Sequence, residues 1–181
     1  SSAFTFWRDG RAFTGTGTYE PVPPPSSFVV GTHIGRSPFT ADTLNGYIPE
    51  IIIYDQVITD AEAQQIQTYL ALKYGTTLDD TNTSVLIQEG DYVLSNGATV
   101  VWDGDVTGIH NSYHHDVAGI GQDTGSGLNQ KISESSNIGN VLTMALDNDF
   151  ITSNASGLRS TSLGNGSFLM WGNDNTSGTT W

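Results

Sequence analysis

Two neighbouring stretches concentrate the side chains that could bind a metal ion or transfer a proton. DGDVTG, residues 103–108, holds two aspartates, and HNSYHHDVAGIGQD, residues 110–123, holds three histidines and two more aspartates. The chain has no cysteine, which excludes disulfides, thiolate metal sites and cysteine nucleophiles. Imidazole nitrogens and carboxylate oxygens are therefore the ligands to consider.

The first stretch fits part of a calcium-binding loop. Asp103, Asp105 and Thr107 occupy positions 1, 3 and 5 of such a loop, and Gly108 stands at the sharp turn. Position 12 should be a bidentate glutamate, and here it is His114. The sequence predicts Ca²⁺ with Asp103, Asp105 and Thr107 as its ligands, and the alternative is an ordinary acidic turn after a strand.

The histidines are a weaker indication of a metal. Glycine and asparagine around His110, His114 and His115 argue against a helix, and on a strand His114 and His115 would point to opposite faces. A zinc site on a strand would need two histidines on one face, a spacing that is missing. We expect His114 and Asp116 to share a face and to hydrogen-bond neighbouring backbone.

Two glycines follow the histidines, at Gly119 and Gly121. Glycine inside a strand often marks a close approach of another group to the backbone. We expect Trp102 or Trp171 to lie against this bare stretch.

The sequence shows no catalytic motif. It lacks the E-x-D-x-E strand of concanavalin-A-like hydrolases, and Glu50 has no acid two residues away. A G-x-S-x-G elbow, an H-E-x-x-H pair and a phosphate loop are also missing. The sequence predicts that the protein is not an enzyme.

Composition restricts the partners and the location. The net charge is −13, and only two of the six basic residues follow residue 75. Such a surface repels nucleic acid and anionic lipid, and no apolar run is long enough to span a membrane. An acidic, cysteine-free chain rich in Gly, Ser, Thr and Asn is typical of exported bacterial proteins, so we expect an extracellular or cell-surface location.

The first part of the chain predicts strands followed by one helix. A hairpin should turn at Asp9-Gly10, and residues 27–35 and 46–55 should form further strands. The helix should span about 60–74, between a capping box formed by Thr59 and Glu62 and a terminating Gly75. The helical face expected to pack on the strand of Ile51–Ile53 consists of Ala63, Ile66, Leu70 and Tyr74.

The polar stretch 76–84 separates this part from a second one in which every pattern favours β-structure. A hairpin should turn at Asn96-Gly97. Further strands are expected within 84–88, 92–102, 113–121, 128–135, 140–147 and 167–172. The fold class predicted is mostly β, with a jelly-roll or β-sandwich portion that carries the one helix, followed by a second β-sandwich-like module.

The segment LNGYIPEIIIYDQVITDAEAQQIQTYLALKYGTTL resembles the C-terminal end of bacterial laminin-G-like, concanavalin-A-like jelly-roll domains. The matching elements are Gly46, Ile48, Glu50, Ile53, Tyr54, Tyr69, Leu70, Lys73, Tyr74 and Gly75. The resemblance implies that residues 1–78 are the C-terminal half of such a domain. It also implies that other domains or chains complete the jelly roll and cover its apolar face.

Residues 79–181 resemble a β-rich module that follows such domains in secreted bacterial surface and adhesin proteins. This module, too, can be an incomplete part of a larger one. The two resemblances imply a non-catalytic extracellular binding or scaffolding segment of a large multidomain protein, with carbohydrate as one candidate ligand. Two alternatives stay open: an accessory module of a secreted carbohydrate-active enzyme, and a segment of an extracellular fibre subunit.

Overall fold

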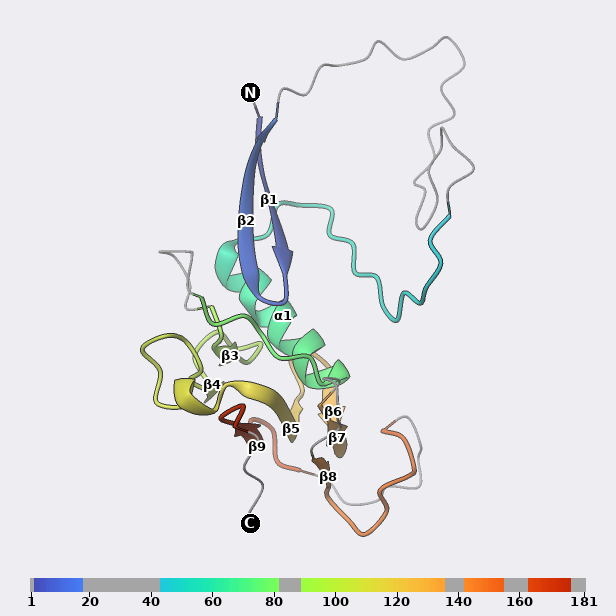
Figure 1. The fold of residues 1–181 in the computed structure, drawn as a ribbon. Helices are drawn as coiled ribbons and strands as arrows, with labels where there is room; N and C mark the ends of the chain where they lie inside the picture. The colour runs from blue at the N-terminus through green and yellow to red at the C-terminus, as the bar shows by residue number, and fades with distance from the viewer. Residues whose placement is uncertain (1, 18–42, 82–88, 136–141, 155–162, 177–181) are drawn as a thin grey trace.

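The computed structural model describes residues 2–17, 43–81, 89–135, 142–154 and 163–176 (Figure 1). Among them the chain is mostly β, with one α-helix and several antiparallel sheets, as predicted. The strands expected at 27–35 and 84–88 lie outside the described residues. The elements are β1 (Ser2–Arg8), β2 (Arg11–Gly17), α1 (Asp60–Tyr74), β3 (Tyr92–Val93), β4 (Val100–Trp102), the 3-10 turn η1 (Asn111–Tyr113), β5 (His115–Asp123), β6 (Leu128–Gln130), β7 (Ile132–Glu134), β8 (Thr143–Ala145) and β9 (Phe168–Asn173).

The first hairpin turns where the sequence predicts it. Strands β1 and β2 pair antiparallel around Asp9 and Gly10, whose φ angles of 50° and 89° are both positive. A two-residue turn of this kind matches the twist of its strands. The turn rests on the segment after the helix, since the amide of Asp79 donates to the carbonyl of Asp9.

Helix α1 has the predicted bounds and caps. The amide of Glu62 donates to the Thr59 hydroxyl at 3.2 Å, and the amide of Thr59 donates to the Glu62 carboxylate at 2.7 Å. Gly75 ends the helix in the left-handed conformation, with a φ of 66°. These contacts satisfy backbone groups that a helix end otherwise leaves without a partner.

The predicted buried face of α1 was wrong by part of a turn. Ile66 and Leu70 are only half-buried, because the sheets of the second part of the chain pack on the opposite flank. On that flank Thr68 is buried as well, and its hydroxyl accepts a hydrogen bond from the amide of Val93 at 2.9 Å. The helix residues that are buried are Ala63, Thr68, Ala71 and Leu72.

The strand predicted at 46–55 is absent. The segment is extended, but a strand needs a hydrogen-bonded neighbour, and the described residues provide none for it. Ile51, Ile52 and Ile53 are consequently exposed rather than buried on both faces. In Figure 1 the segment begins away from the sheets and runs to the start of α1.

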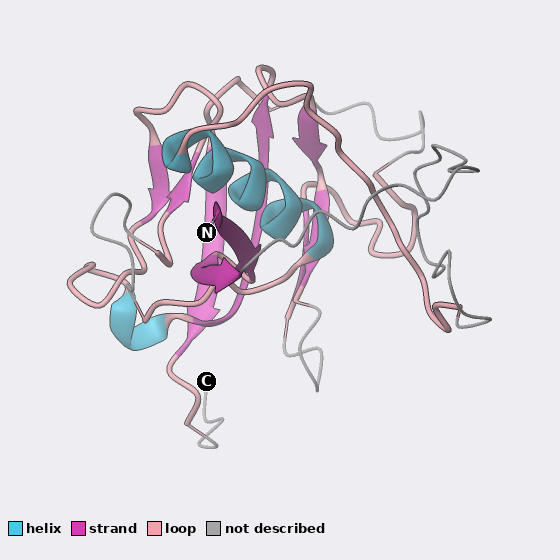
Figure 2. Ribbon diagram, turned by 90° about the horizontal axis from the view of Figure 1, so that it is seen from above, coloured by secondary structure: helices cyan, strands magenta, loops and turns pink. Residues whose placement is uncertain are grey.

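The second part of the chain builds small antiparallel sheets around α1. Strands β3 and β4 form the hairpin predicted at Asn96-Gly97, β5 lies between β6 and β9, and β7 pairs with β8. The helix contacts β3, β5, β6 and β7 and lies across them (Figure 2). The core between helix and sheets consists of Ala71, Leu72, Leu78, Tyr92, Leu94, Trp102, Val117 and Leu128.

The glycines of β5 accommodate side chains other than those predicted. Gly119 pairs with Met170 and Gly121 with Phe168, and these two side chains of β9 lie over the bare backbone. A Cβ at Gly119 would lie 2.3 Å from the Met170 sulfur, and one at Gly121 would lie 2.1 Å from the Phe168 ring. Trp102 packs instead against Gly172.

Candidate functional site

The acidic loop, residues 103–108, connects β4 to η1 and is closed by its own backbone. The amide of Gly108 donates to the carbonyl of Asp105, and the amide of His110 donates to the carbonyl of Asp103, both at 2.9 Å. A Cβ at Gly108 would lie 2.4 Å from the Asp103 carbonyl. The sharp turn expected at Gly108 is therefore present, and the absence of a side chain permits it.

Three carboxylates converge at this loop. Ligand oxygens of Asp91, Asp103 and Asp105 lie within 4.8 Å of one another. Asp105 is 0% exposed and Asp91 is 5% exposed. Carboxylates this deeply buried are unusual unless they are paired or bind a cation. The buried cluster could hold a metal ion.

Asp91 was not predicted, and the hairpin brings it to the loop. Tyr92 of β3 pairs with Trp102 of β4, so the residue before Tyr92 lies beside the residue after Trp102. The carboxylate of Asp91 accepts hydrogen bonds from the amides of Gly104 at 2.9 Å and Asp105 at 3.2 Å. It therefore fixes the backbone of the loop as well as adding a third acid to it.

Thr107 braces the site in a way that the loop pattern did not predict. Its amide and its hydroxyl both donate to Oδ1 of Asp105, at 2.6 and 2.9 Å. These bonds orient the Asp105 carboxylate. Direct ligation of a cation by Thr107 stays a prediction.

The electrostatics of the cluster favour a positive partner. Burial, with the negative charges of Asp105 and Asp103, raises the pKa of Asp91 to about 6, although the amides of Asp105 and Gly104 act in the opposite direction. A raised pKa means that the charged form costs free energy where it lies. A bound cation would offset that cost.

His114 packs under the acidic loop, and both of its ring nitrogens are hydrogen-bonded to groups outside the acidic cluster. Nδ1 accepts a hydrogen bond from the indole N–H of Trp102 at 2.9 Å, so Nε2 carries the proton and donates to the carbonyl of Leu78 at 2.7 Å. Burial lowers the pKa of His114. A Cβ at Gly104 would lie 2.1 Å from His114 Nδ1, so the loop passes directly over the ring. The predicted hydrogen bond to neighbouring backbone is confirmed.

The other two histidines differ from His114 in their surroundings. His110 stacks on Trp102 with 4.4 Å between ring centroids, and its Nδ1 accepts from the amide of Asp103 at 3.3 Å. His115, the first residue of β5, is exposed, whereas His114 precedes the strand and is buried. Asp116 does not join His114, because its positive φ of 51° turns it toward Asn173.

A second polar cluster, the Glu50 latch, holds the extended segment on α1. Lys73 Nζ lies 2.9 Å from the Glu50 carboxylate, and the hydroxyls of Tyr69 and Tyr74 donate to the same carboxylate at 3.1 and 2.9 Å. The hydrogen bond from Lys73 is the largest influence on Glu50 and lowers its pKa. The latch therefore fixes one point of an otherwise unpaired segment.

Comparison with known proteins identifies a family for most of the chain. A family model described as a domain of unknown function, DUF8202, matches residues 62–181. The matched region begins in the first turn of α1 and includes the acidic loop. No curated protein and no solved structure matches the chain. No helix within the described ranges is both long and apolar enough to cross a membrane.

Proposed function

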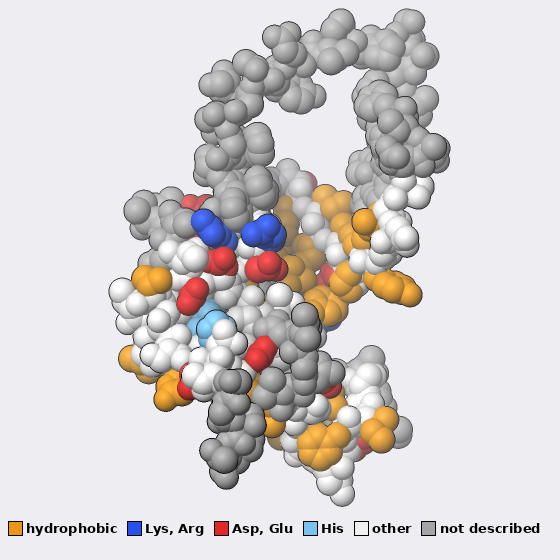
Figure 3. Space-filling model, in the orientation of Figure 1, with side chains coloured by type: hydrophobic (Ala, Val, Ile, Leu, Met, Phe, Trp, Pro, Cys, Tyr) orange, Lys and Arg blue, Asp and Glu red, His pale blue; other side chains and the backbone are white. Residues whose placement is uncertain are grey.

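The chain belongs to the DUF8202 domain family, and we propose that it is a non-catalytic binding or scaffolding segment of an extracellular or cell-surface protein, braced by calcium. The observation that carries the proposal is an exposed apolar strip, defined as residues 44–57. Val57 is 96% exposed and Ile53 is 75% exposed. Its exposed large apolar side chains are Leu44, Tyr47, Ile48, Ile51, Ile52, Ile53, Tyr54 and Val57 (Figure 3).

An apolar surface of this kind favours a protein partner. Soluble proteins rarely expose contiguous apolar patches larger than a few hundred square ångströms unless another molecule covers them. The strip is also extended and has no sheet partner among the described residues, so its backbone can pair with an added strand. The Glu50 latch holds it in place to receive that strand.

The strip presents two different faces. Ile52, Tyr54 and Gln56 turn toward a cavity beside α1. Ile53 and Val57, which alternate with them, are the more exposed. This is the period of a β-strand, although no strand forms. We assign the outward face to a polypeptide, either another domain or another chain, that covers the strip and pairs with its backbone.

The first test is the state of assembly. We expect the 19.4 kDa chain to associate as its concentration rises, because two copies can cover each other's strips. Ile53→Lys with Val57→Lys should return the chain to a monomer, as seen by size-exclusion chromatography with light scattering. Ile151→Lys is the control, since Ile151 is equally exposed on a distant loop. A folded chain that stays monomeric at every concentration would contradict the proposal.

Calcium suits the acidic loop better than zinc does. The ligands on hand are hard carboxylate oxygens from Asp91, Asp103 and Asp105, and none of the described histidines belongs to the cluster. Bound there, calcium would offset two of the three negative charges and tie the β3–β4 hairpin to the loop that follows it. The role is structural, so the proposal assigns no catalytic residue.

Calcium should raise the melting temperature of the wild-type chain. A cation at a hundredfold excess over its dissociation constant adds about 2.7 kcal/mol to the free energy of unfolding. Asp103→Asn with Asp105→Asn should abolish the difference between melts in calcium and in chelator. Asp147→Asn with Asp149→Asn, in an acidic turn outside the cluster, should leave it unchanged. Equal melting temperatures for the wild type with and without calcium would leave the loop as an acidic turn.

A further inference from the structure

A cavity of about 530 Å³ lies between the apolar strip and α1. Its floor is the side of the helix that carries Gln65, Ile66 and Tyr69, and one wall is the inward face of the strip with Tyr54 and Gln56. Two turns from the second part of the chain, at Ser95 and at Ser126, also line it. The volume lies within the range of about 300–1,000 Å³ that is usual for small-ligand sites.

The charges at the cavity exclude an anionic ligand. None of the described residues that line it is a lysine or an arginine. Its two acids already have partners: Glu50 binds Lys73 at 2.9 Å, and Glu62 accepts from the amide and the hydroxyl of Thr59. A phosphate, carboxylate or sulfate group would therefore meet the negative charge of Glu62, and Lys73, which lies beside the Tyr69 ring, is already paired with Glu50. A cation would find only the Glu62 charge among the described lining residues, because Glu50 is neutralised by Lys73.

The remaining groups are uncharged and of two kinds. The amides of Gln56 and Gln65 and the hydroxyl of Ser126 line the cavity beside two tyrosine rings. The Tyr69 hydroxyl is committed to Glu50 and Lys73, so Tyr69 offers its ring. Amides both donate and accept, while a tyrosine ring provides a flat apolar surface with a polar edge.

We infer that this cavity binds a neutral oligosaccharide. A sugar ring offers hydroxyls that donate and accept on its rim and C–H groups on its face, which matches amides beside tyrosine rings. The inference rests on the proposed binding function and gives it a ligand class and a location. It uses the inward face of the strip and so leaves the outward face free for the polypeptide partner.

The alternative occupant, an apolar polypeptide side chain, fits the cavity less well. It would bury the amides of Gln56 and Gln65 without partners, which costs free energy for each unmade hydrogen bond. The outward face, with Ile53 and Val57, poses no such difficulty for a polypeptide. The two faces of the strip therefore suit different partners.

The test is a binding screen of the full chain against immobilised glycans, followed by calorimetry. The probes are neutral gluco-, galacto-, manno- and N-acetylhexosamine oligosaccharides, with sialylated and sulfated glycans as the anionic arm and a lysine-rich peptide as the cationic arm. We expect binding to neutral glycans alone. Tyr54→Ala should weaken that binding tenfold or more, and Gln65→Ala should also weaken it.

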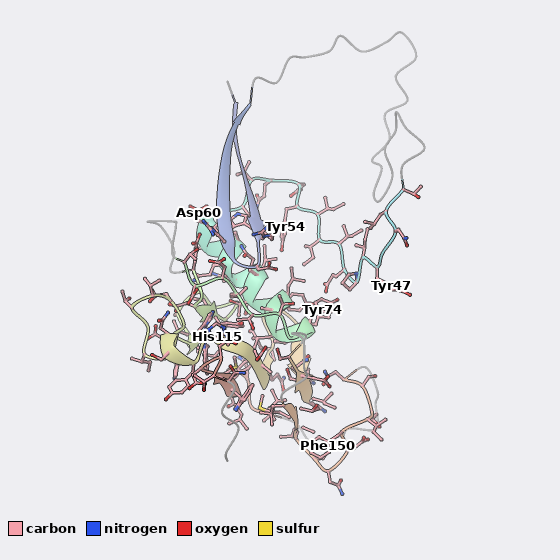
Figure 4. All side chains as sticks on the ribbon, viewed as in Figure 1. Tyr47, Tyr54, Asp60, Tyr74, His115 and Phe150 are labelled. Atoms are coloured by element: carbon pink, nitrogen blue, oxygen red, sulfur yellow. The ribbon has the colours of Figure 1, made fainter. Side chains whose placement is uncertain are left out.

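Tyr47→Ala is the matched control. Tyr47 lies on the same strip and is fully exposed, but it does not line the cavity, and Figure 4 shows it on the far part of the segment from α1. The affinity of Tyr47→Ala for neutral glycans should equal that of the wild type. Absence of binding to every neutral glycan, preference for either charged arm, or equal losses in the two tyrosine variants would each overturn the inference. If assembly through the strip and the calcium-dependent melt persist in that case, the proposed function stands without the sugar.

Discussion

Leu72→Ala should lower the free energy of unfolding by about 2–5 kcal/mol. Leu72 is 1% exposed and lies where α1 meets the sheets of the second part of the chain. Truncation removes apolar contacts and leaves a cavity bounded by Ala71, Leu94 and the rest of that core, which collapses only partly. Urea unfolding followed by circular dichroism measures the loss.

Leu70→Ala is the paired comparison on the same helix. Leu70 carries the same side chain but is half-buried and lines a second cavity, next to Tyr74 and Pro49. Much of its surface already meets solvent, so its truncation should cost about 1 kcal/mol. A larger loss for Leu70→Ala than for Leu72→Ala would mean that the helix packs on its other face, as the sequence alone predicted.

Asp91→Asn should stabilise the calcium-free chain at pH 8 by about 3 kcal/mol. Burial raises the pKa of Asp91 to about 6 from an ordinary 3.8, and a difference of this size is equivalent to about 3 kcal/mol. Asparagine has no charge to bury, and its Oδ1 can still accept from the amides of Gly104 and Asp105. A variant that is more stable than the wild type would show that the Asp91 carboxylate lowers the stability of the calcium-free chain, as expected of a residue that serves binding rather than folding.

The pH dependence follows from the direction of the shift. A carboxyl group whose pKa is higher in the folded state contributes stability at low pH and loses it as pH rises from about 4 through about 6. The advantage of Asp91→Asn should therefore be small below pH 4 and grow to its full size above pH 6. His114, with its lowered pKa, has the opposite dependence, but it is present in both proteins and cancels in the difference.

Calcium should narrow the difference in stability between the two proteins. Wild type should gain stability from the cation, whereas Asp91→Asn, with one ligand fewer, should gain less. Unfolding free energies measured from pH 3.5 to 8, in chelator and in calcium, test both statements. A difference between the proteins that does not vary with pH would show that Asp91 is not held with a raised pKa.

The features predicted to the residue are those fixed by near neighbours in the sequence. The capping box at Thr59 and Glu62, the left-handed Gly75 and the Asp9-Gly10 turn each depend on residues a few positions apart. Their conformations follow from local hydrogen bonds and backbone sterics. Tertiary packing did not alter them.

The features that sequence reasoning missed depend on distant partners. An apolar run such as Ile51–Ile53 indicates burial but does not identify the neighbour that buries it. The face of α1 was misjudged because Thr68, a polar residue, is buried by a hydrogen bond to Val93. Periodicity of apolar residues cannot register such a contact.

The acidic site was half predictable. Asp103 and Asp105 fit a contiguous motif, while Asp91 belongs to the other strand of the hairpin. The sequence does contain a clue: symmetric pairing of the strands around Asn96-Gly97 places Asp91 opposite Trp102, one residue from Asp103. A register shift in the observed hairpin then brings Asp91 beside Asp103 itself. Combining the motif with the hairpin register would have found the third acid.

The bare backbone at Gly119 and Gly121 has a consequence for how the chain folds. Strand β9 must find β5 across a long intervening stretch, and pairings of that kind form late and are prone to slip. The side chains of Met170 and Phe168 occupy space that only glycine leaves open. A slip by one residue would drive these two side chains into the Cβ atoms of β5. The two glycines therefore select one register for the pairing of β9 with β5.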